Sequence, residues 1–444
     1  MTQNNATRAN VKSPPGPSGI LLSEAPRDPL RFLLQLTREY GDVVQFPTAF
    51  GPLYLVNHPD DIRAVLHSST SVRVSMLKMG LGQGLLTSEG SYWRSQRRRM
   101  QPAFHQQCLE SLDALIIGTT VELVRGWREF SESGQAVDVA AEMTRLTLRI
   151  IGKALLGVDF ASKADSISKA IATMLECLKQ LSFFAPSNTI TPSHNRLFQE
   201  AMRTIDKLVY GIIEDRRRGE KRHDLLGLLL EQNGTRSSLS DRRVRDEIVT
   251  MFIAGHETTA NMLAWTWYLL SEHPEVEHRL HSELDKLLGG RFPGNQDVAK
   301  LSYTKMVIQE SMRIYPPVLL LYRKSLVDRR VGDFHIPANS IVAVSPYTAH
   351  RHPGFWEEPD RFDPERFTFE GHSKRPQYAY FPFGGGPHLC MGKVLAMMEG
   401  VLILATIAQN YFLRLGPGER VEPDPFITFR LSHGLRMTLE PRHP

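Results

Sequence analysis

The chain has 444 residues, of which 41% are apolar and 23% charged, with a formal net charge of +5. This balance is typical of a folded globular protein and excludes a disordered chain. The charge is low for a nucleic-acid-binding protein, so we expect no nucleic-acid partner. No apolar run approaches the roughly 20 residues that cross a bilayer, and the polar N-terminus lacks a signal-peptide core. These features predict a cytoplasmic protein without a membrane span.

The cysteine content excludes two further classes of protein. Cys108, Cys177 and Cys390 are widely spaced and odd in number. A disulfide framework and a zinc ribbon both need closely spaced or paired cysteines. The chain therefore fits a reducing compartment, and each cysteine needs an explanation of its own.

The N-terminal part changes character within a few dozen residues. The composition of residues 1–20 indicates a flexible tail that ends in a stiff proline segment, and we expect 21–444 to form a single domain. Apolar spacing predicts a helix over 29–40. Alternating apolar and polar residues over 42–57 predict a β-hairpin.

The rest of the chain is largely helical in pattern. Helical apolar spacing extends from about 91 to 288. Residues 313–344 are rich in prolines and β-branched side chains, which predicts short strands. An irregular, proline-rich segment over 353–387 precedes an apolar helix over 393–409 and closing strands. The predicted fold class is mainly α with small β-sheets.

The segment 383–392 has three consecutive glycines followed by Cys390 and then an apolar helix. Glycines let a flat ligand or another backbone approach closely. A thiolate at the start of a helix is favoured by the helix dipole and by free backbone N–H groups. Taken alone, the segment also fits a buried structural cysteine beside a glycine-rich turn.

Two other segments place polar residues where a functional site would explain them. Glu257 and Thr258 interrupt a long apolar helix over about 246–272, where burial is costly without partners. A threonine that bonds the i−4 carbonyl and bends the helix would also explain them. Trp93 and Arg97 share one helix face, and taken alone they fit an exposed cation–π pair.

Opposite charges also recur in two segments of the C-terminal half. Glu310 and Arg313 are spaced to pair on one helix face, and Arg366 follows a Pro-Glu pair at 364–365. Many surface helices carry such a pair, so the spacing alone is weak evidence. If these charges were buried together, they would fix geometry more than they add stability.

In their order, these segments resemble the cytochrome P-450 family in five motifs, and the resemblance extends from about residue 14 to 441. It implies the cytochrome P-450 fold, with haem b buried between a long central helix and the helix after the cysteine loop. It implies that Cys390 binds the iron, and that Glu257 and Thr258 direct protons during O₂ activation. The haem contacts that it implies are Trp93, Arg97, Arg323, Phe383, Gly386, His388 and Gly392. The structural triad that it implies is Glu310, Arg313 and Arg366.

The resemblance also implies an electron supply. The chain ends soon after the haem region, so we expect NAD(P)H-derived electrons from a separate ferredoxin or flavodoxin-type protein. Arg94, Arg98 and Lys393 could form a cationic docking rim near the cysteine, although simple solvation explains these charges equally well.

Four apolar stretches are candidates for a substrate pocket. Their prominent members are Met76, Met79, Phe183, Phe184, Phe252, Ala254, Leu319 and Leu320. Such residues are often core instead of pocket. The predicted activity is hydroxylation or epoxidation of a hydrophobic molecule such as a fatty acid, terpenoid, steroid or polyketide. The alternatives are C–C coupling, desaturation or isomerisation on the same haem, and a haem sensor without turnover.

Overall fold

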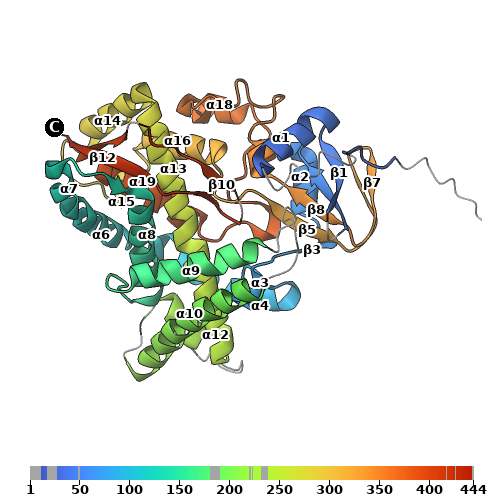
Figure 1. The fold of residues 1–444 in the computed structure, drawn as a ribbon, viewed down its shortest axis with the longest axis horizontal. Helices are drawn as coiled ribbons and strands as arrows, with labels where there is room; N and C mark the ends of the chain where they lie inside the picture. Colours follow the sequence, from blue (N-terminus) through green and yellow to red (C-terminus); the bar gives the residue numbers. More distant parts are fainter. Residues whose placement is uncertain are drawn as a thin grey trace, which may run out of the picture.

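The computed structural model describes residues 12–17, 28–48, 51–180, 191–219, 222, 224–231, 239–416, 418–425 and 427–442. Helices make up most of it, and the largest sheet lies at one side (Figure 1). The helices are α1 Pro29–Tyr40, α2 Pro59–Leu66, α3 Lys78–Leu81, α4 Gly90–Met100, α5 Gln106–Glu110, α6 Asp113–Gly126, α7 Arg128–Ser133, α8 Val139–Leu156, α9 Ala164–Lys179, α10 Pro192–Arg218, α11 Leu225–Leu230, α12 Asp241–Phe252, α13 Thr258–Glu272, α14 Pro274–Leu288, α15 Asn295–Val298, α16 Ser302–Ile314, α17 Pro346–Ala349, α18 Phe369–Ser373 and α19 Lys393–Ala408. The strands are β1 Val43–Thr48, β2 Gly51–Val56, β3 Ser71–Arg73, β4 Val137–Asp138, β5 Leu321–Ser325, β6 Arg329–Val331, β7 Phe334–Ile336, β8 Ile341–Val344, β9 Tyr411–Leu415, β10 Pro423–Pro425, β11 Phe429–Leu431 and β12 Arg436–Pro441. The predicted fold class is confirmed.

The largest sheet has the strand order β1-β2-β8-β5-β3. β1 and β2 form the predicted antiparallel hairpin, with Val43 opposite Val56. β8 pairs with β2 in parallel and with β5 antiparallel, so a strand from late in the chain closes against the N-terminal hairpin. Phe46 of β1 packs its ring edge-on to Phe32 of α1, at 5.5 Å between centroids, which fixes that helix on the sheet.

Part of the predicted tail contacts the sheet. The backbone N–H of Gln45 in β1 donates to the carbonyl of Pro15 over 2.8 Å. The N–H of His335 in β7 donates to the carbonyl of Lys12. Residues 12–17 therefore lie along two strands, whereas the sequence had assigned them to the flexible tail. Proline's missing N–H costs nothing here because Pro15 contributes only its carbonyl.

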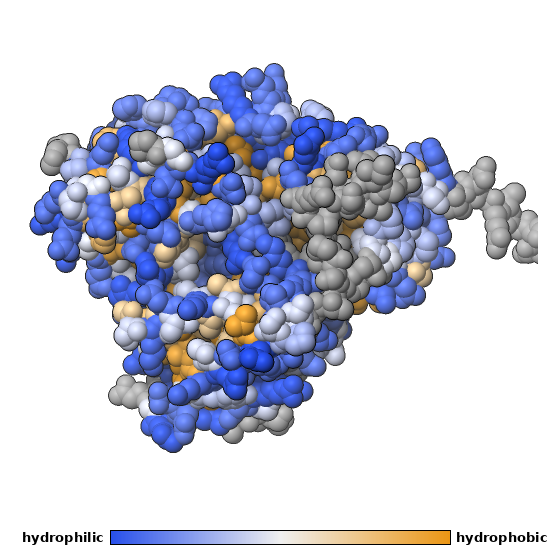
Figure 2. Space-filling view, in the orientation of Figure 1, coloured by the Kyte–Doolittle hydropathy of each residue, from blue (hydrophilic) through white to orange (hydrophobic). Residues whose placement is uncertain are grey.

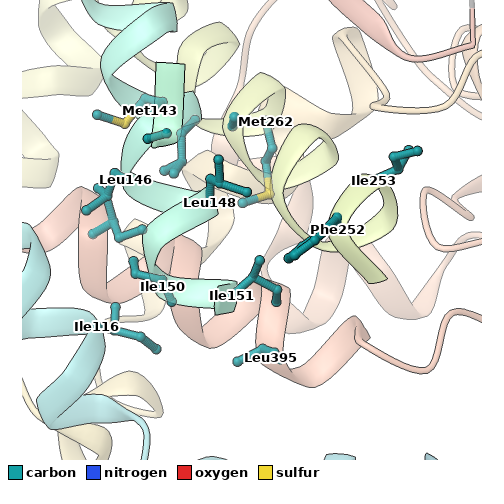
Figure 3. Close-up of a cluster of buried hydrophobic side chains, with 14 of the residues drawn as sticks. Ile116, Met143, Leu146, Leu148, Ile150, Ile151, Phe252, Ile253, Met262 and Leu395 are labelled. Carbon is teal, nitrogen blue, oxygen red and sulfur yellow. The ribbon is translucent and has the colours of Figure 1, made fainter. Parts of the chain in front are cut away.

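The central helix is one continuous element of three parts: α12, a π-helical turn over Ile253–Glu257, and α13. It begins at Asp241 instead of at about 246, and it ends at Glu272 as predicted. α8 packs along it through large aliphatic side chains, and Figure 3 shows Leu148 of α8 beside Met262 and Ile151 of α8 beside Phe252 of the central helix. Close packing on one side leaves the π-helical turn with its other side toward a cavity.

The helix after the cysteine loop is apolar on nearly every face. α19 covers Lys393–Ala408, in agreement with the predicted 393–409, and most of its residues are buried. A helix that is hydrophobic all round belongs in a core. It packs against α6, α13 and α16. α13 and α19 thus form two fixed walls in the middle of the molecule.

Hydrophilic side chains cover most of the face shown in Figure 2, and hydrophobic ones appear mainly in recesses between helices. Within the described residues, no helix combines the length and apolarity needed to cross a membrane.

Candidate functional site

A cavity of about 380 Å³ lies between the central helix, the cysteine loop and the start of α19. Its walls also include the segment 73–77 and strand β5. The predicted haem and iron contacts that line it are Trp93, Arg97, Arg323, Phe383, His388, Cys390 and Gly392. The predicted catalytic and pocket residues that line it are Thr258, Met76, Ala254, Leu319 and Leu320. Segments hundreds of residues apart are therefore brought to one site.

The thiol of Cys390 opens into this cavity at the start of α19. The loop is held by a hydrogen bond of 3.1 Å from the Cys390 N–H to the Phe383 carbonyl. Burial in the protein raises the pKa of the thiol, while backbone N–H groups of Gly392 and Lys393 lower it. These N–H groups stabilise negative charge on the sulfur. The sulfur is thus prepared to act as a thiolate once a cation binds it.

Gly386 serves the loop in a different way from the predicted haem contact. Its φ is +66°, a conformation that favours glycine, and a Cβ here would lie 2.3 Å from the carbonyl oxygen of Leu66. It is absent from the cavity lining. Gly386 therefore lets the cysteine loop pack against the end of α2, which corrects its assignment as a cofactor contact.

Aromatic and cationic side chains line the cavity beside the cysteine loop. The rings of Trp93 and His388 lie 4.0 Å apart between centroids. The Arg97 guanidinium lies 5.8 Å from the Trp93 ring centroid and donates to the Leu389 carbonyl over 2.9 Å. Trp93 is buried, Arg97 is partly exposed, and both line the cavity, so the pair is not a free surface cation–π pair.

Arg323 is a buried cation that forms no ion pair within the described part of the chain. It is 5% exposed, and its guanidinium donates a hydrogen bond to the neighbouring Tyr322 carbonyl. Burial, together with repulsion from Arg73, lowers its pKa to about 10. β3 places Arg73 directly opposite Arg323, and Glu89 neutralises Arg73 at 2.6 Å. An anion in the cavity would complete this arrangement, because unpaired buried charge is costly.

Arg73 lines the cavity but was missed in the sequence. Its position depends on the register between β3 and β5, and no local pattern around residue 73 announces that register. A second missed residue is Glu399, an acid within the apolar α19 that also lines the cavity. Burial raises the pKa of Glu399 to about 8, so its carboxyl is largely neutral at neutral pH. An acid in such an apolar helix was an available signal.

The polar interruption of the central helix forms the π-helical turn. The Thr258 hydroxyl donates to the Ala254 carbonyl over 2.7 Å, the i−4 bond that bends a helix. Both residues also line the cavity. Gly255 is required by packing, because a Cβ there would lie 2.7 Å from the Ile151 side chain. The structural interpretation of this segment is confirmed by the i−4 bond, and the segment also borders the cavity. π-turns often occur at functional sites.

Glu257 makes a contact that the sequence did not suggest. Its Oε1 accepts a hydrogen bond of 2.5 Å from the hydroxyl of Thr428, which follows β10 and lines the cavity. Its Oε2 is buried and has no hydrogen-bond partner among the described residues. Burial raises the pKa of this carboxyl, although Thr428 opposes the shift. Glu257 therefore tends to hold a proton next to the cavity wall.

The predicted triad is brought together away from the cavity. Arg313 Nε lies 2.7 Å from Glu310 Oε2, and Arg366 Nε lies 3.4 Å from Glu310 Oε1. The side chains of Glu310 and Arg313 are both fully buried. Arg313 also donates to the carbonyls of His350 and Arg361, which tie down the irregular segment before the cysteine loop. The cluster orders that segment.

Four predicted pocket residues need separate comment. Met79 is 55% exposed on α3 and does not line the cavity, because its side chain faces outward from that short helix. Phe252 is 1% exposed and packs edge-on to Phe160 at 5.3 Å, on the side of the central helix away from the cavity lining. These two assignments are corrected. Phe183 and Phe184 lie outside the described residues.

Comparison with known proteins decides the family. The model of the family described as cytochrome P-450 matches residues 14–433. The chain belongs to the cytochrome P-450 family. Cyclooctat-9-en-7-ol 5-monooxygenase of Streptomyces melanosporofaciens is 35% identical over 414 residues, covering 88% of this chain and 86% of the relative. Cyclooctatin synthase of the same organism is 33% identical over 434 residues, covering 94% and 92%.

Solved structures agree with this assignment. The cytochrome P-450DA heme domain matches with a TM-score of 0.88 and 27% identity, covering 98% of this chain and 99% of that one. The protein is a cytochrome P-450 monooxygenase with haem as its cofactor. The cavity fits haem, since Cys390 presents a sulfur ligand and Arg323 lacks an anionic partner that a propionate would supply.

Proposed function

We propose that this cytochrome P-450 hydroxylates or epoxidises a hydrophobic small molecule, using electrons from a separate redox protein. The observation that carries the proposal is the cavity itself. Cys390 lies in one wall and Thr258 in another, while much of the remaining lining is apolar. Its apolar members include Met76, Leu85, Leu86, Leu319 and Leu320. Such a site binds a ligand mainly through apolar contact and orients it by a few polar groups.

Bound haem supplies the activation of O₂, and the chain supplies binding, orientation and protons. Cys390 would hold the iron, and Arg323, Arg97, Trp93 and His388 would hold the propionates. The apolar walls exclude water from the substrate. Thr258 keeps a hydroxyl at the cavity surface, and its oxygen lone pairs remain able to accept a hydrogen bond.

Glu257 is the proposed proton source for this cavity. A general acid works best when it holds a proton near neutral pH, and burial moves Glu257 in that direction. Proton delivery then separates productive turnover from wasteful release of peroxide. The control of that proton by Glu257 and Thr258 is the catalytic part of the proposal.

The relatives narrow the substrate class. One of them is named as acting on cyclooctat-9-en-7-ol, whose name denotes an unsaturated alcohol. We infer for this chain a weakly polar substrate of similar kind, such as a terpenoid. Apart from the charged residues assigned to haem binding, the cavity presents the hydroxyls of Thr258, Thr259 and Thr428, which suit a substrate with a single hydroxyl.

An exposed rim beside the cysteine loop supports a separate electron donor. Arg94, Arg98 and Lys393 are exposed, and none forms an ion pair with a described acidic residue. Leu389 and Val394 beside them are 39% and 57% exposed. Cations around an apolar centre fit an acidic ferredoxin or flavodoxin-type protein, and such complementarity raises the rate of association.

The first test is the CO difference spectrum of the dithionite-reduced protein, in which a thiolate ligand gives a strongly red-shifted Soret band. Turnover with a surrogate ferredoxin and NADPH should then yield a product one oxygen atom heavier than the substrate. A product lighter by two hydrogens, an isomer or a coupled product would replace hydroxylation by one of the alternative reactions. NADPH consumption without any product across a library of hydrophobic compounds would contradict the proposed substrate class. It would favour the alternative of a haem sensor.

A further inference from the structure

The hydroxyl of Thr428 donates a hydrogen bond to the Glu257 carboxyl, and the two residues are 171 positions apart in the chain. Thr428 is 6% exposed and lines the cavity. Thr428 therefore forms part of the cavity wall, and its hydroxyl contacts the buried carboxyl of Glu257. The side chain of Thr428 thus connects the proposed proton source, Glu257, with the wall of the cavity.

The segment that carries Thr428 is firmly anchored. The Phe429 N–H donates to the Pro317 carbonyl over 2.9 Å, and the Trp265 indole N–H donates to the Phe429 carbonyl over 2.9 Å. The first bond fixes the hairpin β10–β11 to the segment before β5, and the second fixes it to α13. Because these are backbone contacts next to Thr428, its hydroxyl has little freedom relative to Glu257.

An ionic network fixes the other side of the hairpin. Arg430 pairs with Asp424 at 2.9 Å and with Glu176 of α9 at 2.7 Å. Lys179 of α9 pairs with Asp424 at 2.6 Å. These four groups extend from partly buried Asp424 to half-exposed Glu176. They therefore connect the surroundings of Glu257 with solvent.

The charged groups around Glu257 act in opposite directions on its proton. Arg430 attracts the carboxylate form, and Asp424 repels it. Lys179 and Glu176 act through those two residues, to which they are paired. His256, the neighbour of Glu257 on the central helix, is kept neutral because burial lowers its pKa to about 4. Thr428 is uncharged, so its hydrogen bond orients the Glu257 carboxyl without adding a charge beside it.

We propose that Thr428 is a positioning residue, whose hydroxyl holds Glu257 Oε1 at the hairpin so that Oε2 is the oxygen available for proton exchange. The inference rests on the proposed role of Glu257 as a proton source. Without the hydroxyl, Oε1 loses its hydrogen bond and neither carboxyl oxygen has a described partner, while the attraction to Arg430 remains. The acid would then turn away from the cavity, and misplacement of about 1 Å costs much of a catalytic group's effect.

The direct test is infrared spectroscopy of the haem-loaded protein, which follows the C=O stretch of protonated Glu257. The band is assigned by its loss in Glu257→Gln. In Thr428→Val the band should shift to higher frequency, because the carbonyl oxygen no longer accepts a hydrogen bond. The midpoint of its pH titration should also rise, because a hydrogen bond to the carboxylate is lost. Thr428→Ser keeps the hydroxyl and should restore both values.

Turnover then decides whether the contact matters for the reaction. Product formed per NADPH should fall about tenfold in Thr428→Val and recover in Thr428→Ser. An unchanged infrared band in Thr428→Val would overturn the inference, as would a shifted band with unchanged coupling. Equal losses in both variants would show that Thr428 acts through substrate packing alone and would also overturn it. If the unsubstituted protein shows an intact CO spectrum but no turnover, the proposed function is contradicted. The intact spectrum excludes loss of haem as the cause.

Discussion

The carboxylate of Glu247 on α12 accepts a hydrogen bond of 2.8 Å from the backbone N–H of Leu85. Its neighbour Asp246 accepts one of 2.9 Å from the N–H of Gln83. Two adjacent acids of the central helix thus hold the backbone of the segment 83–86. In this segment the side chains of Leu85 and Leu86 line the cavity. The position of this cavity wall depends on buried carboxylates, and its stability should depend on pH.

Stability should therefore fall between about pH 4.5 and 7 because of Glu247. Burial raises its pKa from 4.5 to about 7, with Asp246 adding repulsion. The native protein then binds more protons than the unfolded chain in this window, so its free energy of unfolding decreases as pH rises. At about 1.4 kcal/mol per pKa unit, the contribution is about 3 kcal/mol.

The substitution Glu247→Gln keeps an acceptor for Leu85 and removes the titration. Urea unfolding of the haem-loaded protein at several pH values should show a flatter profile than the unmodified protein. Glu272→Gln, at an exposed acid, serves as the control and should leave the profile unchanged. A profile of equal slope in Glu247→Gln would contradict the assignment.

Removal of the thiol from the cysteine loop should abolish thiolate ligation. Cys390→Ala should lose the red-shifted Soret band of the reduced CO complex, because Cys390 is the cysteine that lines the cavity among the described residues. Cys108→Ala, at an exposed cysteine, is the matched control and should retain the band. Retention of the band in Cys390→Ala would disprove the ligand assignment.

Arg323 should contribute to haem retention through its charge. Arg323→Gln removes a buried cation that lacks a described anionic partner, so haem loses a charge-assisted hydrogen bond worth about 1.5–3 kcal/mol. Transfer of haem to apomyoglobin should become about 10-fold to 100-fold faster. Arg330→Gln, at an exposed arginine, should transfer haem at the original rate. Equal rates in the two variants would exclude a propionate contact.

The buried triad should be far more important for stability than an exposed ion pair. Arg313→Leu leaves Glu310 buried without its main partner, which costs about 3–5 kcal/mol. Arg361→Ala removes an exposed pair with Glu358 and should cost less than about 1 kcal/mol. Urea unfolding of both haem-loaded variants gives the comparison. Similar losses would mean that the triad's geometry is not maintained in solution.

Thr258 should govern how well electrons are used. In Thr258→Ala the cavity loses a hydroxyl at the central helix, and the fraction of NADPH that ends as peroxide should rise by about tenfold. Thr258→Ser retains the hydroxyl and should keep most of the coupling. The peroxide released per NADPH is measured in both variants. Unchanged coupling in Thr258→Ala would remove this residue from the mechanism.

Local sequence patterns were sufficient for the separate elements. Alternation around β1 and β2 predicted the hairpin, and continuous apolar character predicted α19, because both patterns reflect burial within a single element. The motif around Cys390 carries the resemblance to the family, and that resemblance predicts Cys390 as the iron ligand. Where chemistry needs residues close in the chain, the sequence carries the signal directly.

Contacts between distant segments were decided by tertiary structure. The register of β3 on β5 placed Arg73 opposite Arg323, and the anchored hairpin brought Thr428 to Glu257. Phe252 is large and apolar, as a pocket residue would be, but the orientation of the central helix places its ring against Phe160. The chemistry of a side chain determines what it can contact. Packing of whole elements fixes what it does contact, because the orientation of a helix or strand is set by all its buried residues together.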